Sequence, residues 1–119
     1  MSDPAAIAQA YLATWNEADA ARRASLMKQH WSEDAVYADP LMAARGAGQI
    51  SGLVAAVHER FPGFRFKPLG TPNGHGKFVR LAWTLGPEGG EAPIEGSDVV
   101  VVDAGRIREV IGFIDRAPG

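Results

Sequence analysis

The chain of 119 residues contains no cysteine. It therefore has no disulfide framework, no thiolate nucleophile and no zinc–thiolate site, and a reducing, intracellular environment suits it. Its longest wholly apolar run is only a few residues, far short of the roughly 20 that a membrane-spanning helix needs. Residues Met1 to Pro4 lack the basic-then-apolar pattern of a signal peptide. We therefore expect a cytoplasmic protein without a membrane partner.

The sequence also has no excess of charge of one sign. It carries 12 Lys and Arg against 14 Asp and Glu, a formal net charge of -2, and the cations are scattered along the chain. Nucleic acid is not an expected partner, because a phosphate backbone is bound by a basic stripe or patch. His30 and His58 have no second ligand at helical spacing, and no glycine-rich phosphate loop precedes a helix. We expect neither a metal nor a cofactor.

The remaining composition fits a single soluble domain covering residues 1–119. Hydrophobic residues make up 46% of the chain and charged residues 22%, which is typical of a globular protein. Apolar residues at helical spacing, with capping residues before them, predict helices over 4–16, about 20–30 and about 50–61. The second of these helices should bury Ala24, Met27 and Trp31.

The pattern of period two predicts strands in the rest of the chain. One strand, residues 35–39, lies between the second and third helices, and the others are expected at 64–69, 77–85, 92–102 and 106–114. Residues 41–46 and 70–76 are expected to be loops. Helices gathered at the front and an antiparallel meander behind them favour an α+β fold, with helices covering one face of the sheet.

Three polar residues fall on faces that otherwise read as apolar. Tyr11 lies on the apolar side of the first helix, and Asp39 shares one side of its strand with Tyr37. Asp98 alternates with apolar neighbours, so its carboxyl is expected to be buried and its pKa raised. One carboxyl could then remove a proton while a neutral acid and a phenol donate hydrogen bonds to a developing oxyanion.

Each of these residues also has a simpler interpretation. Asp39 precedes a proline and could cap a backbone amide at the strand end. Asp98 could face solvent at a β-bulge near Gly96, and Tyr11 could be a core tyrosine bonded to a backbone carbonyl.

The order of motifs resembles the SnoaL-like branch of the NTF2-like superfamily, and also Δ5-3-ketosteroid isomerase. The similarity covers nearly the whole chain and is carried by the segments Tyr11-Leu-Ala-Thr-Trp-Asn16, Ser32-Glu-Asp-Ala-Val-Tyr-Ala-Asp39-Pro40, Gly96-Ser-Asp98 and Asp103-Ala-Gly-Arg-Ile107. The resemblance implies an NTF2-like cone, in which the N-terminal helices pack in the concave face of a strongly curved antiparallel sheet. It also implies a ligand cavity at the open end and a homodimer formed through the sheet.

Carried over from the resemblance, Asp39 corresponds to the general base, and Tyr11 and Asp98 to the oxyanion donors. Asp98 also corresponds to the acid/base aspartate of SnoaL-type polyketide cyclases. Trp31 and Val54 stand where the isomerase has supporting tyrosines, which argues against a steroid isomerase as such. The expected substrate pocket comprises Trp15, Trp31, Tyr37, Val54, Trp83, Val100 and Gly112.

Two classes of function remain open from the sequence. One is a cofactor-independent isomerase or cyclase that acts on an apolar, carbonyl-containing small molecule, with hydrolysis or dehydration by a related site as a further option. The other is a non-catalytic module that binds a small molecule or serves as a dimerisation scaffold. Mixed polar residues on the outer sheet face are compatible with a homodimer.

Overall fold

The computed structural model describes residues 3–118, which form three helices and one six-stranded sheet. The helices are α1 (Pro4–Asn16), α2 (Ala20–His30) and α3 (Ala47–Arg60). The strands are β1 (Trp31–Ala38), β2 (Ala43–Arg45), β3 (Phe64–His75), β4 (Phe78–Pro87), β5 (Ile94–Asp103) and β6 (Arg106–Arg116). The three expected helices and the α+β class are confirmed.

The helix boundaries follow from local hydrogen bonding. Asp3 caps α1 through a bond from the Ala5 amide, and Pro4 occupies the first turn, where its missing N–H costs nothing. Asp19 caps α2 by accepting from the Arg22 amide at 2.9 Å. Helix α3 ends before Pro62-Gly63, and Gly63 takes a positive φ of 79° that only glycine adopts without strain.

The buried side of α2 differs from the expectation. Met27 is buried as expected, and Trp31 is buried too but is the first residue of β1, whereas Ala24 is exposed and Arg23 is buried instead. The Arg23 guanidinium donates to the Ser51 hydroxyl and to the Glu17 carbonyl, at 2.8 and 2.6 Å. These hydrogen bonds allow the charged side chain of Arg23 to be buried against α3, on the side of α2 where Ala24 was expected.

The strand order is β2-β1-β6-β5-β4-β3, and every neighbouring pair is antiparallel except β1 with β6. The expectation of a wholly antiparallel sheet is therefore wrong for this one pair. The chain returns from the β3–β6 meander to place β6 beside β1, parallel to it. No local sequence pattern predicts this pairing, because β1 and β6 are far apart in the sequence.

Two expected loops contain strand residues. Residues 41–46 include the short strand β2, and residues 70–75 belong to β3. The register of β3 against β4 shifts between Leu69 and Asn73. The glycines and prolines of this stretch are thus accommodated by an irregularity in an edge strand, where missing ladder bonds are tolerated.

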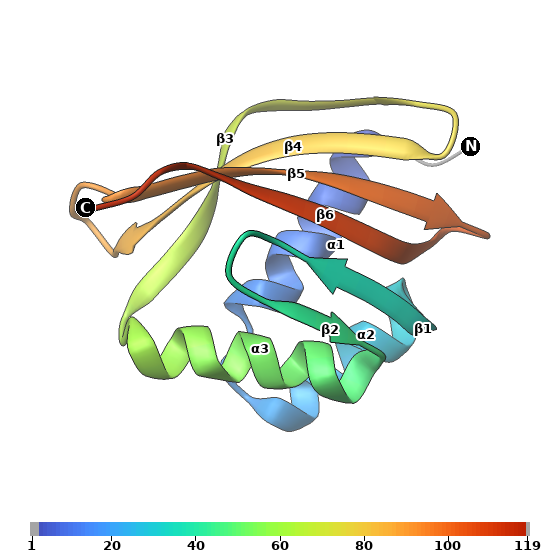
Figure 1. Cartoon of the computed structure of the whole chain (residues 1–119), viewed down its shortest axis with the longest axis horizontal. Helices are drawn as coiled ribbons and strands as arrows, with labels where there is room; N and C mark the ends of the chain where they lie inside the picture. Colours follow the sequence, from blue (N-terminus) through green and yellow to red (C-terminus); the bar gives the residue numbers. More distant parts are fainter. Residues whose placement is uncertain (1–2, 119) are drawn as a thin grey trace.

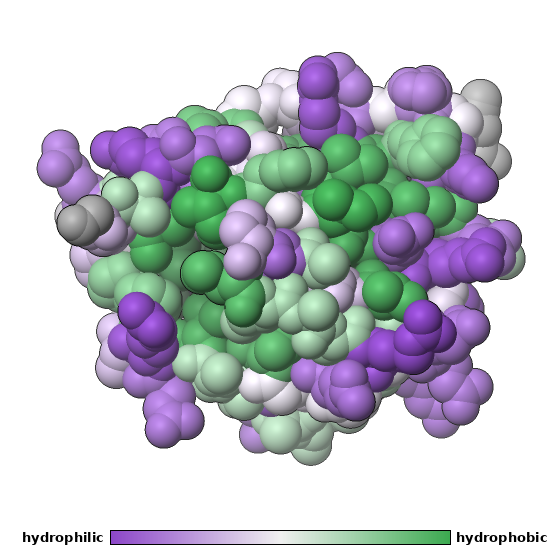
Figure 2. All heavy atoms as spheres, in the orientation of Figure 1, coloured by the Kyte–Doolittle hydropathy of each residue, from purple (hydrophilic) through white to green (hydrophobic). Residues whose placement is uncertain are grey.

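Figure 1 shows α1 behind β5 and β6, and α3 beneath the β1–β2 hairpin, so the curved sheet has its helices on one face. Side chains alternate along β4 and β5, and their inner positions are buried against the helices. The opposite face carries Val99, Val101, Ile111 and Phe113, of which Phe113 is 51% exposed. Figure 2 shows apolar residues over much of the middle of this face, with hydrophilic residues around its rim.

Among residues 3–118, no helix combines the length and apolar character needed to cross a membrane.

Candidate functional site

The register of three strands brings the two expected acids together. Asp98 of β5 is paired with Gly112 of β6, and Ala38 of β1 is paired with Ile111, so Asp39 follows beside Gly112. The three positions thus form a row across the sheet, and a Cβ built on Gly112 would lie 2.7 Å from Asp98 Oδ1 and 3.2 Å from Asp39 Cβ. Asp39 and Asp98 therefore lie on the same side of the sheet, on either side of Gly112.

Asp98 is held by two donors that use the same carboxyl oxygen. The Tyr11 hydroxyl donates to Oδ2 at 2.6 Å, and the Trp83 indole N–H donates to Oδ2 at 3.0 Å. Oδ1 has no hydrogen-bond partner within residues 3–118, although Asp98 is only 2% exposed. Asp98 thus presents one free oxygen over Gly112.

The environment of Asp98 raises the pKa of its carboxyl group toward neutral pH. Burial raises the pKa of Asp98 from an ordinary value of 3.8 to about 6, and the Asp39 charge acts in the same direction. Hydrogen bonds from Tyr11 and Trp83 oppose the rise, because they stabilise the ionised carboxylate. Burial, with the Asp98 charge beside it, also raises the pKa of Tyr11 well above 10, so Tyr11 remains a proton donor in its hydrogen bond.

Asp39 has partners for both carboxyl oxygens. Oδ1 accepts from the backbone amides of Leu41 and Met42, each at 2.8 Å, and thereby caps the turn between β1 and β2. Oδ2 accepts from the Tyr37 hydroxyl at 2.6 Å. The simpler interpretation of Asp39, a strand-end cap, is therefore part of what the residue does. Burial raises the pKa of Tyr37, and the hydrogen bond to Asp39 adds to this effect.

Aromatic rings pack around the two acids. The Trp15 ring centroid lies 5.4 Å from that of Tyr37 and 6.4 Å from that of Tyr11. The Tyr37 hydroxyl lies 3.5 Å from the point where a Gly112 Cβ would stand. The expected residues Tyr11, Trp15, Tyr37, Trp83 and Gly112 thus gather around Asp98 and Asp39.

The other three expected pocket residues lie around this group rather than in it. Val54 and Val100 are fully buried core residues. Trp31 packs its ring 5.8 Å from the Tyr11 ring, and its indole N–H donates to the Thr14 hydroxyl at 3.1 Å. Trp31 therefore packs on the Tyr11 ring and is itself held by the hydrogen bond to Thr14.

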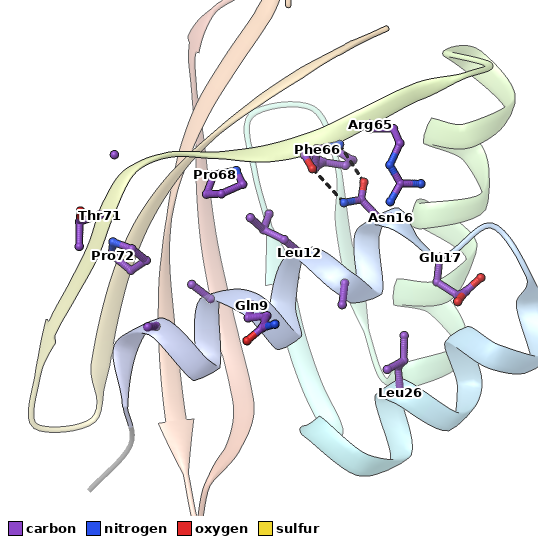
Figure 3. A pocket seen from close by; sticks show the side chains of 14 residues that line it. Gln9, Leu12, Asn16, Glu17, Leu26, Arg65, Phe66, Pro68, Thr71 and Pro72 are labelled. Atoms are coloured by element: carbon purple, nitrogen blue, oxygen red, sulfur yellow. Dashed lines mark hydrogen bonds between the residues drawn. The ribbon is translucent and has the colours of Figure 1, made fainter. Parts of the chain in front are cut away.

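Two surface hollows were not expected from the sequence. One, of about 840 Å³, is a groove between α1 and β3 whose floor includes Leu12, Phe66 and Pro68, as Figure 3 shows. At one end the Asn16 side chain binds both backbone groups of Phe66, each at 2.8 Å. The other hollow, of about 720 Å³, is lined by residues of α2, β1 and α3 and by Arg106. Tyr11, Asp39 and Asp98 line neither hollow.

No three His, Asp or Glu side chains gather as a candidate metal site within residues 3–118.

The comparison with known families decides where this chain belongs. A model of the SnoaL-like domain matches residues 8–110. The chain is a member of the SnoaL-like family. No curated protein matches it.

Solved structures extend the comparison of this SnoaL-like chain. It is 46% identical, with a TM-score of 0.88, to a SnoaL-like family protein from Agrobacterium tumefaciens that was provisionally assigned as an isomerase; the match covers 92% of this chain and 95% of that one. A provisionally assigned ketosteroid isomerase from Kribbella flavida is 19% identical, with a TM-score of 0.72, covering 98% and 80% of the two chains.

A provisionally assigned polyketide cyclase from Sinorhizobium meliloti is 15% identical to this SnoaL-like chain, with a TM-score of 0.71, covering 89% and 92%. At this identity, the likeness concerns the fold. Together with an NTF2-like protein from Cytophaga hutchinsonii, these structures confirm the NTF2-like α+β architecture expected from the sequence.

Proposed function

We propose that this SnoaL-like protein is a cofactor-independent enzyme that transfers a proton on an apolar carbonyl compound, with Asp98 as acid and base. The observation that carries the proposal is a buried carboxyl of pKa about 6 whose Oδ1 is free above Gly112. A base of this pKa exchanges protons readily near neutral pH. The 46% identical relative, provisionally assigned as an isomerase, supports isomerisation as one outcome of such a transfer.

The chemistry begins with removal of a proton from the carbon next to the carbonyl group. Oδ1 of ionised Asp98 takes the proton, and the electrons of the C–H bond form an enolate whose charge rests on the carbonyl oxygen. Return of the proton from Asp98 to a different carbon gives isomerisation. Attack of the enolate carbon on a second carbonyl of the same molecule gives an aldol cyclisation, and Asp98 then protonates the new alkoxide.

We assign the proton transfer to Asp98 rather than to Asp39, because both oxygens of Asp39 already accept hydrogen bonds. In this assignment Asp39 is a positioning residue. Its carboxylate fixes the Tyr37 hydroxyl and the β1–β2 turn, and its charge helps to raise the pKa of Asp98. Tyr11 and Trp83 orient the Asp98 carboxyl so that Oδ1 faces the ligand.

The experiment is deuterium exchange at the carbon next to the carbonyl in α-tetralone and other apolar ketones, followed by NMR in D2O. The wild-type protein should exchange at least one ketone of the panel faster than buffer does. Asp98→Asn should lose this activity about 100-fold or more, and Asp39→Asn should lose less. Asp34→Asn, the same change at an exposed position of β1, is the control and should exchange like the wild type.

Equal exchange by wild type and Asp98→Asn would contradict the proposal. So would a larger loss in Asp39→Asn than in Asp98→Asn, because the base would then be Asp39.

A second candidate function is a non-catalytic small-molecule carrier. The groove of about 840 Å³ between α1 and β3 favours it, because it is large enough for a ligand and is lined by neither Asp39 nor Asp98. In that case Leu12→Gln, in the groove floor, would weaken binding of apolar ketones, and no member of the panel would exchange deuterium.

We also propose that two copies of the chain associate through the outer face of the sheet. Val99, Val101, Ile111 and Phe113 make the centre of this face apolar, and a second copy would remove it from water. Light scattering should then give twice the chain mass of 12.7 kDa. Phe113→Glu should shift the mass to that of one chain, while Leu41→Glu, at an exposed apolar residue of the β1–β2 turn, should not.

A particle of 12.7 kDa in the wild-type protein would contradict the dimer. The cytoplasmic location stays a prediction, which cell fractionation checks.

A further inference from the structure

One buried hydrogen-bond donor near the site has no acceptor. Trp15 is 3% exposed. Among the fully buried side-chain nitrogen and oxygen atoms of residues 3–118, its Nε1 is the one that has no hydrogen-bond partner. Leaving such a group unpaired costs free energy, so each case in a folded protein calls for a physical reason. The position of Trp15 supplies one.

The Trp15 indole lies among the groups that surround the two acids. Its ring packs against the rings of Tyr11, Tyr37 and Phe66, with centroids 5.4 to 6.4 Å away. The indole N–H approaches the Tyr11 hydroxyl and lowers the pKa of that phenol as a hydrogen-bond donor does, against the larger effect of burial, but the two groups do not reach hydrogen-bond geometry. The N–H therefore lies beside the Tyr11 hydroxyl, which in turn donates to Asp98.

The other donors around the two acids are already engaged. Tyr11 and Trp83 donate to Asp98, and Tyr37 donates to Asp39. A ligand oxygen could accept a hydrogen bond from Tyr11, Trp83 or Tyr37 only if the existing hydrogen bond to Asp98 or Asp39 were broken. The Trp15 N–H can be used without breaking any bond within the protein.

We propose that the Trp15 indole N–H donates a hydrogen bond to the carbonyl oxygen of the ligand, and that this contact makes the site specific for ketones and enones. The inference rests on the proposed function, because it assigns the oxygen that becomes negative in the enolate. The indole keeps its proton throughout, since it is a donor only. The bond strengthens as charge develops on the oxygen, which favours the transition state over the bound ketone.

The arrangement also orients the ligand. With its oxygen at Trp15 and its neighbouring carbon at Asp98 Oδ1, the ketone presents the C–H bond to the free carboxyl oxygen. A hydrocarbon of the same shape has no acceptor for Trp15 and should bind less well. An acceptor oxygen, rather than a particular ring system, is the feature that the site recognises.

The chain's three tryptophans make a direct test possible. Isotope-labelled tryptophan gives one indole N–H signal per residue in a two-dimensional NMR spectrum, assigned through Trp→Phe variants. Addition of α-tetralone should move the Trp15 proton signal downfield, as a new hydrogen bond does, and should leave the Trp31 signal in place because Trp31 donates to Thr14. Addition of tetralin, the same ring system without the oxygen, should not move Trp15 downfield.

A Trp15 signal that stays in place while the ketone saturates other signals of the protein would overturn the proposal. So would an equal downfield shift with tetralin. A signal that is already downfield in the free protein would also overturn it, because the N–H would then be hydrogen-bonded before the ligand arrives.

A variant tests the contact by affinity. Trp15→Phe should lower the ratio of α-tetralone to tetralin affinity about tenfold, the worth of one hydrogen bond to an oxygen acceptor. The ratio cancels the loss of packing that both ligands suffer equally. An unchanged ratio in a folded variant would contradict the proposal, and the NMR test on the wild-type protein does not depend on whether the variant folds.

The two proposals fail in different ways. A downfield shift of Trp15 with α-tetralone, without deuterium exchange on any ketone, would keep the Trp15 contact and reject proton transfer. Exchange that depends on Asp98, with Trp15 unmoved, would keep the function and reject the contact.

Discussion

Replacing Asp98 with asparagine should remove a pH dependence of stability that the buried carboxyl creates. The pKa of Asp98 is about 6 in the folded protein against 3.8 ordinarily. Between these values the folded chain holds a proton that the unfolded chain has released, so stability falls as pH rises. The contribution is complete below the unfolded pKa and is lost as pH passes through the folded one. Two pKa units correspond to roughly 3 kcal/mol of unfolding free energy.

The amide of asparagine is a close isostere, and its oxygen can still accept from Tyr11 and Trp83. Urea unfolding of both proteins, at fixed protein concentration from about pH 4 to about pH 8, isolates the effect. The stability of Asp98→Asn relative to the wild type should rise by about 3 kcal/mol over this range, while Asp34→Asn should show no such trend. A constant difference between Asp98→Asn and the wild type would refute a raised pKa at Asp98.

Two further predictions concern access to Asp98 and its tuning. Gly112→Ala would place a methyl carbon 2.7 Å from Asp98 Oδ1, so ketone exchange should fall about 100-fold. The control Gly48→Ala, whose added methyl group meets nothing within 4 Å, should leave exchange unchanged. A fully active Gly112→Ala protein would show that the ligand does not lie over Gly112. Tyr11→Phe removes a hydrogen bond that lowers the pKa of Asp98, so the pH dependence of exchange should move upward by roughly one unit, and a downward or absent shift would contradict this role of Tyr11.

The burial of Asp98 could be predicted from the sequence because strand alternation is local. Its companions at every second position of β5, such as Ile94 and Val100, are apolar, and one buried face follows from that pattern. The position of Tyr11 on α1 follows in the same way from helical periodicity. The resemblance to the SnoaL-like family added the idea that these groups meet.

The meeting point itself depends on contacts between distant strands. The parallel pairing of β1 with β6 places Asp39 beside Gly112, and nothing in either segment predicts a partner so far along the chain. The hydrogen bond from Trp83 to Asp98 likewise depends on the β4–β5 register. The sequence suggested Tyr37 as a pocket residue but not as the donor to Asp39, because Asp39 follows the last residue of β1 and its carboxyl turns back toward the phenol.

The pH profile of ketone exchange tests the central claim, that Asp98 is the base, most directly. With α-tetralone or a faster ketone of the panel, kcat/KM reports the pKa of the base in the free protein. If ionised Asp98 takes the proton, kcat/KM should rise with pH, bend at the pKa of about 6 and then remain level, and Asp98→Asn should lose this step. A rate that falls as pH passes this value would contradict the claim, because the active form of Asp98 would then be the protonated acid.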